Sequence, residues 1–251
     1  LELREDEDWE INPDRLRKLI DKKKTHGIVI NTPHNPLGTV YDRKILEEIA
    51  DIAVEYDLYI FSDEAYEKLV YDRKHVSVGS LNGMNDYVVS FFTFSKSYAM
   101  CGYRLGYAVG PKNLIQAMTK VSHYVTLSAP TISQLVGVKA LSLSGTYTEM
   151  MRKEYDRRRK FIVKRLNEIG LRTKMPYGAF YTFSSIKDTT RKNSYDFAKD
   201  LLQKARVAVV PGTEFGSFGE GYIRCSYATE LGKIKIAMDR IEKFLKKKDK
   251  F

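Results

Sequence analysis

The sequence predicts an α/β fold with a mostly parallel sheet and helices on both faces, followed by a smaller α+β domain. With 251 residues, 43% of them hydrophobic, the chain is long enough to bury a full core. In its first part, short apolar runs alternate with helical patterns, which is typical of strand–helix–strand units and a parallel sheet. Further along, short strands surround a few helices instead. We therefore predict a large domain over residues 1–145 and a small domain over residues 146–251.

The strands of the large domain are indicated by short runs of β-branched and aromatic residues. These runs are too short for buried helices and are bounded by turn residues. Between them, apolar residues recur at helical spacing, and Asp42 stands where an N-cap is expected. The predicted strands are 27–31, 58–62, 87–94 and 105–110, and the predicted helices are 14–20, 42–56, 111–124 and one that follows Pro130.

A long helix leads from the large domain into the small one. It is expected to start at the capping box formed by Thr146 and Glu149 and to end at Gly170. The remaining predicted elements are strands in 171–184, 207–211 and 222–228, with helices over 195–205 and 230–247.

Composition limits the functional classes. No apolar run approaches the roughly 18 residues that span a bilayer, so we expect no membrane partner. The net charge of +10 is spread among 32 acids, and the dense run from Lys246 to Lys250 is a chain end, so we expect no nucleic-acid partner. Two cysteines, Cys101 and Cys225, are too few for a disulfide framework or a zinc site and fit a reducing cytoplasm. We therefore expect a cytoplasmic protein without a metal site.

Three polar residues follow the ends of successive predicted strands. Asn35 comes after strand 27–31, in a loop whose prolines and glycine exclude regular structure. Asp63 and Lys96 follow the next two strands. Ligands bind beyond the carboxyl ends of the strands in open α/β sheets, so we expect the three side chains to face one crevice.

Lys96 is a candidate nucleophile. A lysine at a strand end is partly desolvated, which lowers its pKa and lets the amine attack an aldehyde. Arg104 is able to bind a phosphate through two parallel hydrogen bonds, and Thr93 adds a hydroxyl donor. An aldehyde together with a phosphate indicates pyridoxal phosphate. A strand-end lysine is also a common solvated cation, so this stretch alone leaves both interpretations open.

Asp63, Tyr66 and Asn35 match the needs of the pyridine ring of that cofactor. An aspartate beside the ring nitrogen keeps it protonated, and the protonated ring withdraws electrons from an attached carbanion. Tyr66 and Asn35 are suitable donors for the phenolic oxygen of the ring. Structural alternatives exist: Asp63 fits a helix N-cap, and Asn35 fits an Asx-turn before Pro36. The arrangement of all three with Lys96 favours the cofactor site.

Arg224 is the candidate residue of the small domain. It lies inside the predicted strand 222–228, where a charge is costly unless it is paired. The residues leave two alternatives open: an internal salt bridge with Glu214 or Glu220, or a functional role.

Four motifs resemble those of the class I aminotransferases, in the branch that holds many bacterial and archaeal aspartate and aromatic enzymes. They occur in the family's order, at similar spacing, over essentially the whole chain. Leu37 departs from the pattern, since it replaces the commoner threonine of the first motif. The motifs are Asn31-Thr-Pro-His-Asn-Pro-Leu-Gly38, Ser62-Asp-Glu-Ala-Tyr66, Ser95-Lys-Ser-Tyr-Ala-Met-Cys-Gly-Tyr-Arg-Leu-Gly106 and Ile223-Arg-Cys-Ser-Tyr-Ala228.

The resemblance implies the type I fold of pyridoxal-phosphate enzymes and a homodimer with active sites at the interface. It implies exchange of an amino group between an L-amino acid and a 2-oxo acid, with Lys96 moving the Cα proton of the substrate. By residue, it implies Lys96 as the Schiff-base lysine, Asp63 at the pyridine nitrogen, Tyr66 and Asn35 at the phenolic oxygen, Thr93 and Arg104 at the phosphate, and Arg224 at the substrate α-carboxylate.

In the family, the glycine-rich phosphate loop and the aromatic residue that stacks on the ring lie upstream of these motifs. We therefore expect the chain to be the later part of a longer protein, inactive alone. Two other functions stay open as alternatives. One is a carbon–sulfur β-lyase of the same fold, and the other is a transcription regulator with an aminotransferase-like effector domain.

Overall fold

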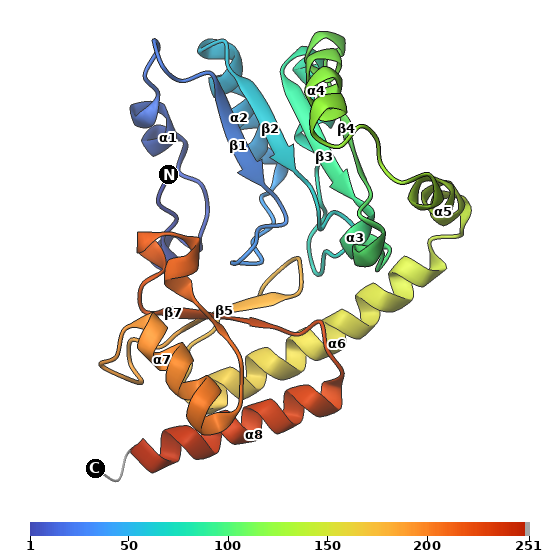
Figure 1. Cartoon of the computed structure of the whole chain (residues 1–251). Helices are drawn as coiled ribbons and strands as arrows, with labels where there is room; N and C mark the ends of the chain where they lie inside the picture. Colours follow the sequence, from blue (N-terminus) through green and yellow to red (C-terminus); the bar gives the residue numbers. More distant parts are fainter. Residues whose placement is uncertain (249–251) are drawn as a thin grey trace. The chain divides into compact units, whose positions relative to one another are not determined.

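The computed structural model describes residues 1–248 and contains two compact units. The first unit comprises Leu3–His34 and Thr39–Met150, and the second comprises Asn35–Gly38 and the chain from Met151 onward. Near the N-terminus, Leu1 groups with the first unit and Glu2 with the second. The predicted division between residues 145 and 146 into independent domains stays a prediction. Most helices and strands of the two units are labelled in Figure 1.

A four-stranded sheet forms the centre of the first unit. Its order is β1-β2-β3-β4, with β1 parallel to β2, β2 parallel to β3 and β4 antiparallel to β3. The prediction of a mostly parallel sheet is therefore confirmed. The strands are β1 (Gly27–Asn31), β2 (Tyr59–Asp63), β3 (Val88–Thr93) and β4 (Gly106–Val109).

Helix α2 (Arg43–Glu55) covers one face of this sheet, as Figure 1 shows. Asp42 caps it as predicted, because its carboxylate accepts a hydrogen bond from the Ile45 amide. The apolar stripe of α2 is fully buried in one cluster with the strands, and each large aliphatic side chain buried there stabilises the fold by about 1.5–3 kcal/mol. The opposite face is less covered, since the Val29 side chain of β1 is 78% exposed.

The remaining helices of the first unit include one that the sequence did not predict. Lys96 was expected in a loop after the third strand, but it lies in the short helix α3 (Phe94–Ser97). The predicted strand 87–94 therefore ends at Thr93, whose side chain caps the helix by accepting a hydrogen bond from the Ser95 amide. The other three helices are α1 (Pro13–Leu19), α4 (Lys112–Val125) and α5 (Thr131–Ser142).

The second unit contains a three-stranded antiparallel sheet in the order β5-β7-β6. Only the end of the predicted strand 171–184 is regular, because the chain before it contributes a single bridge between Thr173 and Ser184. The strands are β5 (Tyr181–Ser185), β6 (Val210–Pro211) and β7 (Tyr222–Ser226), and the helices are α6 (Thr146–Glu168), α7 (Ser194–Asp200) with its π-helical extension Leu201–Ala205, and α8 (Leu231–Lys248).

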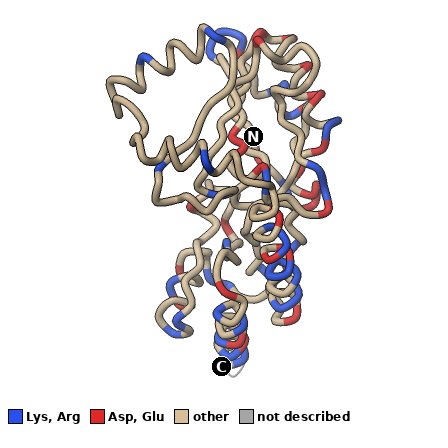
Figure 2. The backbone as a smooth tube through the Cα atoms, turned by 90° about the vertical axis from the view of Figure 1, so that its right-hand side faces the viewer, with Lys and Arg blue, Asp and Glu red and all other residues tan. Residues whose placement is uncertain are grey.

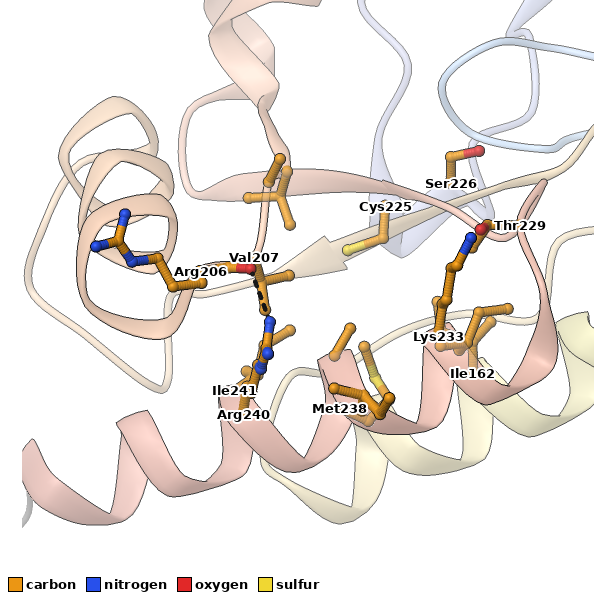
Figure 3. Close-up of a pocket in the computed structure, with 15 residues that line it drawn as sticks. Ile162, Arg206, Val207, Cys225, Ser226, Thr229, Lys233, Met238, Arg240 and Ile241 are labelled. Atoms are coloured by element: carbon orange, nitrogen blue, oxygen red, sulfur yellow. Dashed lines mark hydrogen bonds between the residues drawn. The ribbon is translucent and has the colours of Figure 1, made fainter.

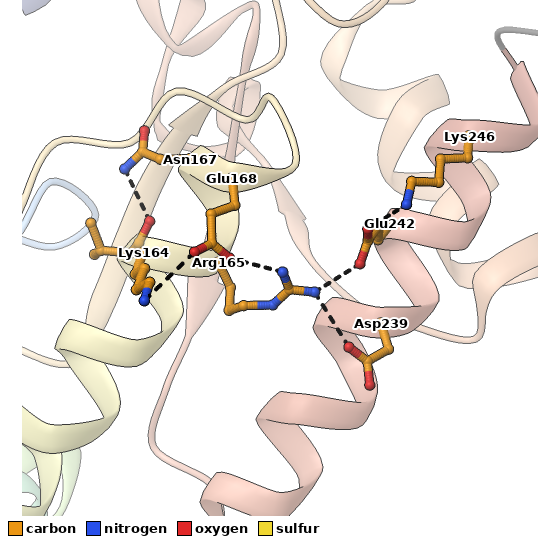
Figure 4. Close-up of polar contacts among 8 residues, drawn as sticks. Lys164, Arg165, Asn167, Glu168, Asp239, Glu242 and Lys246 are labelled. Atoms are coloured by element: carbon orange, nitrogen blue, oxygen red, sulfur yellow. Dashed lines mark hydrogen bonds and ion pairs between the residues drawn. The ribbon is translucent and has the colours of Figure 1, made fainter.

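Ion pairs link the long helices α6 and α8 (Figure 4). Arg165 on α6 contacts two residues of α8, Asp239 at 3.4 Å and Glu242 at 2.8 Å, and also Glu168 of its own helix at 2.9 Å. Exposed pairs of this kind are screened by solvent, so they fix the register of the helices more than they stabilise them. Stability comes instead from the apolar side chains that both helices bury.

Positive and negative residues are interspersed along the helices that lead to the C terminus (Figure 2). The end of the basic run, Asp249 and Lys250, lies outside the described residues. Within residues 1–248, no helix combines the length and the apolar character that crossing a membrane requires.

Candidate functional site

Asp63 ends strand β2 and its side chain is exposed at the sheet edge. One carboxylate oxygen, Oδ1, accepts a hydrogen bond from the Ala65 amide at 3.1 Å, so Asp63 caps a turn and not the helix considered as its structural alternative. The second oxygen has no hydrogen-bond partner in the described part of the chain. The capping role and a ligand-binding role therefore use different oxygens of one carboxylate.

Lys96 and Tyr66 lie close together at the same edge. The Lys96 Nζ atom is 5.8 Å from the centre of the Tyr66 ring, and the ring itself is buried. Parallel pairing of β2 with β3 explains this proximity, because it aligns Asp63 with Phe91 and brings the following segments to one side. The structure thus brings together an amine, a phenol and, at the end of β2, a carboxylate.

The side chains of Thr93 and Arg104, the two predicted phosphate-binding residues, form hydrogen bonds with the backbone of the chain. The Thr93 hydroxyl donates its single proton to the Leu105 carbonyl oxygen at 3.2 Å and accepts from the Ser95 amide. Arg104 is exposed in a left-handed conformation, with Nη1 donating to the Cys101 carbonyl oxygen at 3.0 Å. Phosphate contacts by these two residues stay predictions, and for Thr93 they require the hydroxyl to leave Leu105.

In the second unit, Arg224 lies on β7, the central strand of the antiparallel sheet. Its Nη1 donates to Asn35 Oδ1 at 2.8 Å. The guanidinium carbon is 4.3 Å from the centre of the Tyr181 ring and 4.8 Å from that of the Phe215 ring. Two aromatic faces stabilise the cation and hold its plane in place.

The predicted salt-bridge alternative for Arg224 is not what the structure contains. Across the described residues, Arg224 forms no ion pair with Glu214 or Glu220, and its buried Nε atom has no hydrogen-bond acceptor. The Glu220 carboxylate instead accepts from the amide groups of Ser194 and Gly221, each at 2.8 Å. A half-buried guanidinium whose buried Nε atom has no acceptor is unfavourable, so this site can bind a carboxylate through parallel hydrogen bonds.

Asn35 is held by a backbone contact three residues further on. The Gly38 carbonyl oxygen accepts hydrogen bonds from the amides of both Tyr177 and Gly178, each at 2.8 Å. Gly38 has a φ of +70°, and a Cβ atom there would lie 2.3 Å from the Pro176 Cβ atom. Only glycine fits, so this contact fixes the loop that presents the Asn35 amide to Arg224.

Arg159 on α6 stabilises the segment whose amides bind the Gly38 carbonyl oxygen. Its side chain is fully buried, with Nη1 donating to the Pro176 carbonyl oxygen at 2.7 Å and Nη2 paired with Asp156. Because a buried guanidinium is costly without such partners, the pairing ties α6 to the segment that binds Gly38.

The aromatic segment 177–181 has two roles. Tyr181 lies against the Arg224 guanidinium, with its ring centre 4.3 Å from the guanidinium carbon. Phe180 instead packs against Tyr155 with ring centres 5.5 Å apart and is buried in the core.

A separate pocket of about 440 Å³ lies between β7 and α8 (Figure 3). Apolar side chains such as Ile234 and Met238 line most of it, and the Lys233 amine lies at its edge. Burial raises the pKa of the Cys225 thiol in its wall to about 11, so this thiol stays protonated and unreactive at neutral pH. None of the predicted site residues lines this pocket.

Two features of these sites are absent from the sequence predictions. One is the contact of Gly38 with Tyr177 and Gly178, and the other is a polar cluster next to Asp63, in which the fully buried Glu64 contacts the partly buried His75 and Ser77. The available signal for the cluster was a charged residue at an inward position beside a strand end. Within residues 1–248, no group of three or more His, Cys, Asp or Glu side chains could hold a metal ion.

The family and the relatives that this chain resembles are all described as aminotransferases. The family described as "Aminotransferase class I and II" matches residues 1–241. The chain is 48% identical to an aspartate aminotransferase of Pyrococcus abyssi and 46% identical to an aromatic-amino-acid aminotransferase of Thermococcus litoralis, in each case over 97% of this chain and 63% of the relative. It therefore spans less than two thirds of these relatives.

Solved structures of aminotransferases have the same fold as this chain. An aromatic aminotransferase from Pyrococcus horikoshii OT3 superposes with a TM-score of 0.94 at 46% identity, covering 98% of this chain and 66% of that protein. A double mutant of the Thermus thermophilus aspartate aminotransferase gives a TM-score of 0.90 at 37% identity, covering 96% of this chain and 62% of that protein. The predicted type I fold of pyridoxal-phosphate enzymes is therefore confirmed.

Replacing Gly38 tests the contact that holds Asn35. We expect Gly38→Ala to lower the free energy of unfolding by about 2–5 kcal/mol, because both the left-handed φ and the clash with Pro176 are penalised. Gly170→Ala is the control, since Gly170 has a φ of +85° with no atom within 4 Å of the added Cβ, and should lose only about 1–2 kcal/mol. Urea unfolding of the full-length protein measures both. Equal losses would show that the Gly38 contact does not constrain the loop.

Proposed function

Because this chain belongs to the class I and II aminotransferases, we propose that the whole protein transfers an amino group between an L-amino acid and a 2-oxo acid. The observation that supports this most directly is the Arg224 guanidinium, half-buried between two aromatic rings without an anionic partner in the described chain. The β-lyase and regulator functions are set aside, because the family and the relatives named above are aminotransferases.

Members of the family generally depend on pyridoxal phosphate. The residues at the ends of β2 and β3 fit that cofactor, because an amine, a phenol and a carboxylate with one unshared oxygen gather there. When bound, the cofactor supplies an electron sink for the negative charge that develops at the substrate Cα. Lys96 would be its covalent anchor, Asp63 would bind the pyridine nitrogen, Tyr66 and Asn35 the phenolic oxygen, and Thr93 and Arg104 the phosphate.

Different residues of the chain would then bind the substrate, move its proton and hold the pyridine ring. Arg224 binds the α-carboxylate of either substrate with two hydrogen bonds, and Asn35 fixes its guanidinium plane. This anchor orients the Cα–H bond, so that the Lys96 amine can remove and return that proton as a general base and acid. The Asp63 carboxylate would accept the hydrogen bond of the protonated pyridine nitrogen and keep that proton in place, which stabilises the charge that forms when the Cα proton leaves.

We also propose a cytoplasmic homodimer. Both cysteines are free, which fits a reducing compartment. Helix α5 exposes apolar side chains at Ile132, Leu135 and Val138, each about 70% exposed, and such a surface needs a cover in the assembled protein. A second copy of the chain would supply one.

Arg224→Lys tests the substrate anchor. A lysine cannot make the two-pronged contact, so we expect kcat/KM of the full-length enzyme to fall about a hundredfold, for aspartate and aromatic amino acids alike. Arg240→Lys, on α8, is the matched control and should leave kcat/KM unchanged. An Arg224→Lys enzyme with normal kinetics, or with reduced melting temperature as its only defect, would argue against a substrate anchor.

Asp63→Asn tests the residue at the end of β2. The asparagine side-chain oxygen can still accept the hydrogen bond from the Ala65 amide, but a neutral side chain cannot hold the pyridinium proton. We therefore expect turnover to fall by several orders of magnitude, since each 1.36 kcal/mol added to the barrier slows the reaction about tenfold. Stopped-flow kinetics of the full-length enzyme measure the loss, with Asp51→Asn on the exposed face of α2 as control. Near-normal turnover of Asp63→Asn would leave Asp63 only its capping role.

A further inference from the structure

Glu64 is a fully buried carboxylate next to the candidate cofactor site. It directly follows Asp63, and its amide continues the sheet by donating to the Phe91 carbonyl oxygen at 3.0 Å. Successive side chains of an extended chain point to opposite faces, so Asp63 is exposed while Glu64 points into the protein. Tyr66 follows two residues later and is 4% exposed.

Both oxygens of the Glu64 carboxylate are bound. The His75 Nε2 atom lies 2.7 Å from Oε2, and the Ser77 hydroxyl donates to Oε1 at 2.8 Å. The Ser77 Oγ atom is also 3.4 Å from the Ser90 Oγ atom. Since Ser77 gives its only proton to Glu64, Ser90 must be the donor in this last contact. The hydrogen bonds therefore run in one direction, from Ser90 on β3 through Ser77 to Glu64.

This arrangement is costly if it serves stability alone. Burying a carboxylate is unfavourable, and well-packed apolar side chains often replace a buried polar pair without loss of stability. The polar cluster instead fixes the orientation of the backbone around it. Its hydrogen bonds join the end of β2 to the segment 75–77 and to β3. Strand β2 carries Asp63, and strand β3 leads to Lys96 (Figure 1).

We propose that the polar cluster of the buried Glu64 with the partly buried His75 and Ser77 positions Asp63 and Tyr66 relative to Lys96 for binding pyridoxal phosphate. This inference rests on the proposed function, and the members of the cluster are positioning residues. Removing the His75 contact frees Glu64 to rotate, and the turn that carries Asp63 and Tyr66 then loses its fixed orientation. Cofactor affinity and the electronic environment of the ring should both change.

The test measures cofactor binding to the full-length protein. Apoprotein is titrated with pyridoxal phosphate by fluorescence quenching, and the absorbance maximum of the bound cofactor is recorded. We expect Glu64→Gln and His75→Leu to raise the Kd about tenfold or more and to shift the absorbance maximum. His75→Gln, whose amide places a donor where Nε2 stands, should restore most of the affinity. Glu47→Gln, at an exposed ion pair on α2, is the matched control and should leave the Kd unchanged.

A purely structural cluster would behave differently. Its variants would lower the melting temperature of the apoprotein and leave the Kd and the absorbance maximum of the folded fraction unchanged, which would overturn the proposal. The double variant Glu64→Leu/His75→Leu covers the case in which single variants fold poorly, because an apolar pair leaves no unpaired charge. It should fold and still bind the cofactor weakly, and normal affinity would overturn the proposal. A wild-type protein that does not bind pyridoxal phosphate would overturn the proposed function itself.

Discussion

Parallel hydrogen bonding between β2 and β3 determines the chemistry available to the first unit. It pairs Asp63 with Phe91, so that the residues following each strand emerge on the same side of the sheet. Asp63 then presents an oxygen at the edge, and α3 carries the Lys96 amine to within 5.8 Å of the Tyr66 ring centre. A register shift of one residue would exchange Asp63 with Glu64 and bury the wrong carboxylate.

In the second unit, the corresponding constraint is a guanidinium that lacks an internal anion. Aromatic rings and the Asn35 amide fix the plane of Arg224 without neutralising it. Neutralisation is therefore left to a ligand, and a carboxylate satisfies both the charge and the buried Nε donor. The Gly38 contact supplies the rigidity that such an anchor requires, since Asn35 lies on a loop and not on a strand.

The sequence predicts the parts of this arrangement that depend on local patterns. Parallel strands, the helix capped by Asp42, and polar residues at strand ends are all local signals, so Asp63, Tyr66 and Lys96 could be identified as neighbours. The short helix α3 was missed because a single turn is too short for a periodic pattern. The proximity of Asn35 and Arg224 joins residues 189 positions apart, and without the family resemblance nothing in either segment indicates it. The partners of Thr93 and Glu64 are likewise set by tertiary packing, which residue types alone do not reveal.

The central claim is that Lys96 is the residue to which the cofactor attaches, and chemical trapping tests it most directly. Full-length protein loaded with pyridoxal phosphate is reduced with borohydride, digested, and analysed by peptide mass spectrometry. We expect a pyridoxyl group on Lys96, with no comparable labelling of Lys68, an exposed lysine in the segment that follows β2. Labelling of any other lysine, with Lys96 unmodified, would contradict the account.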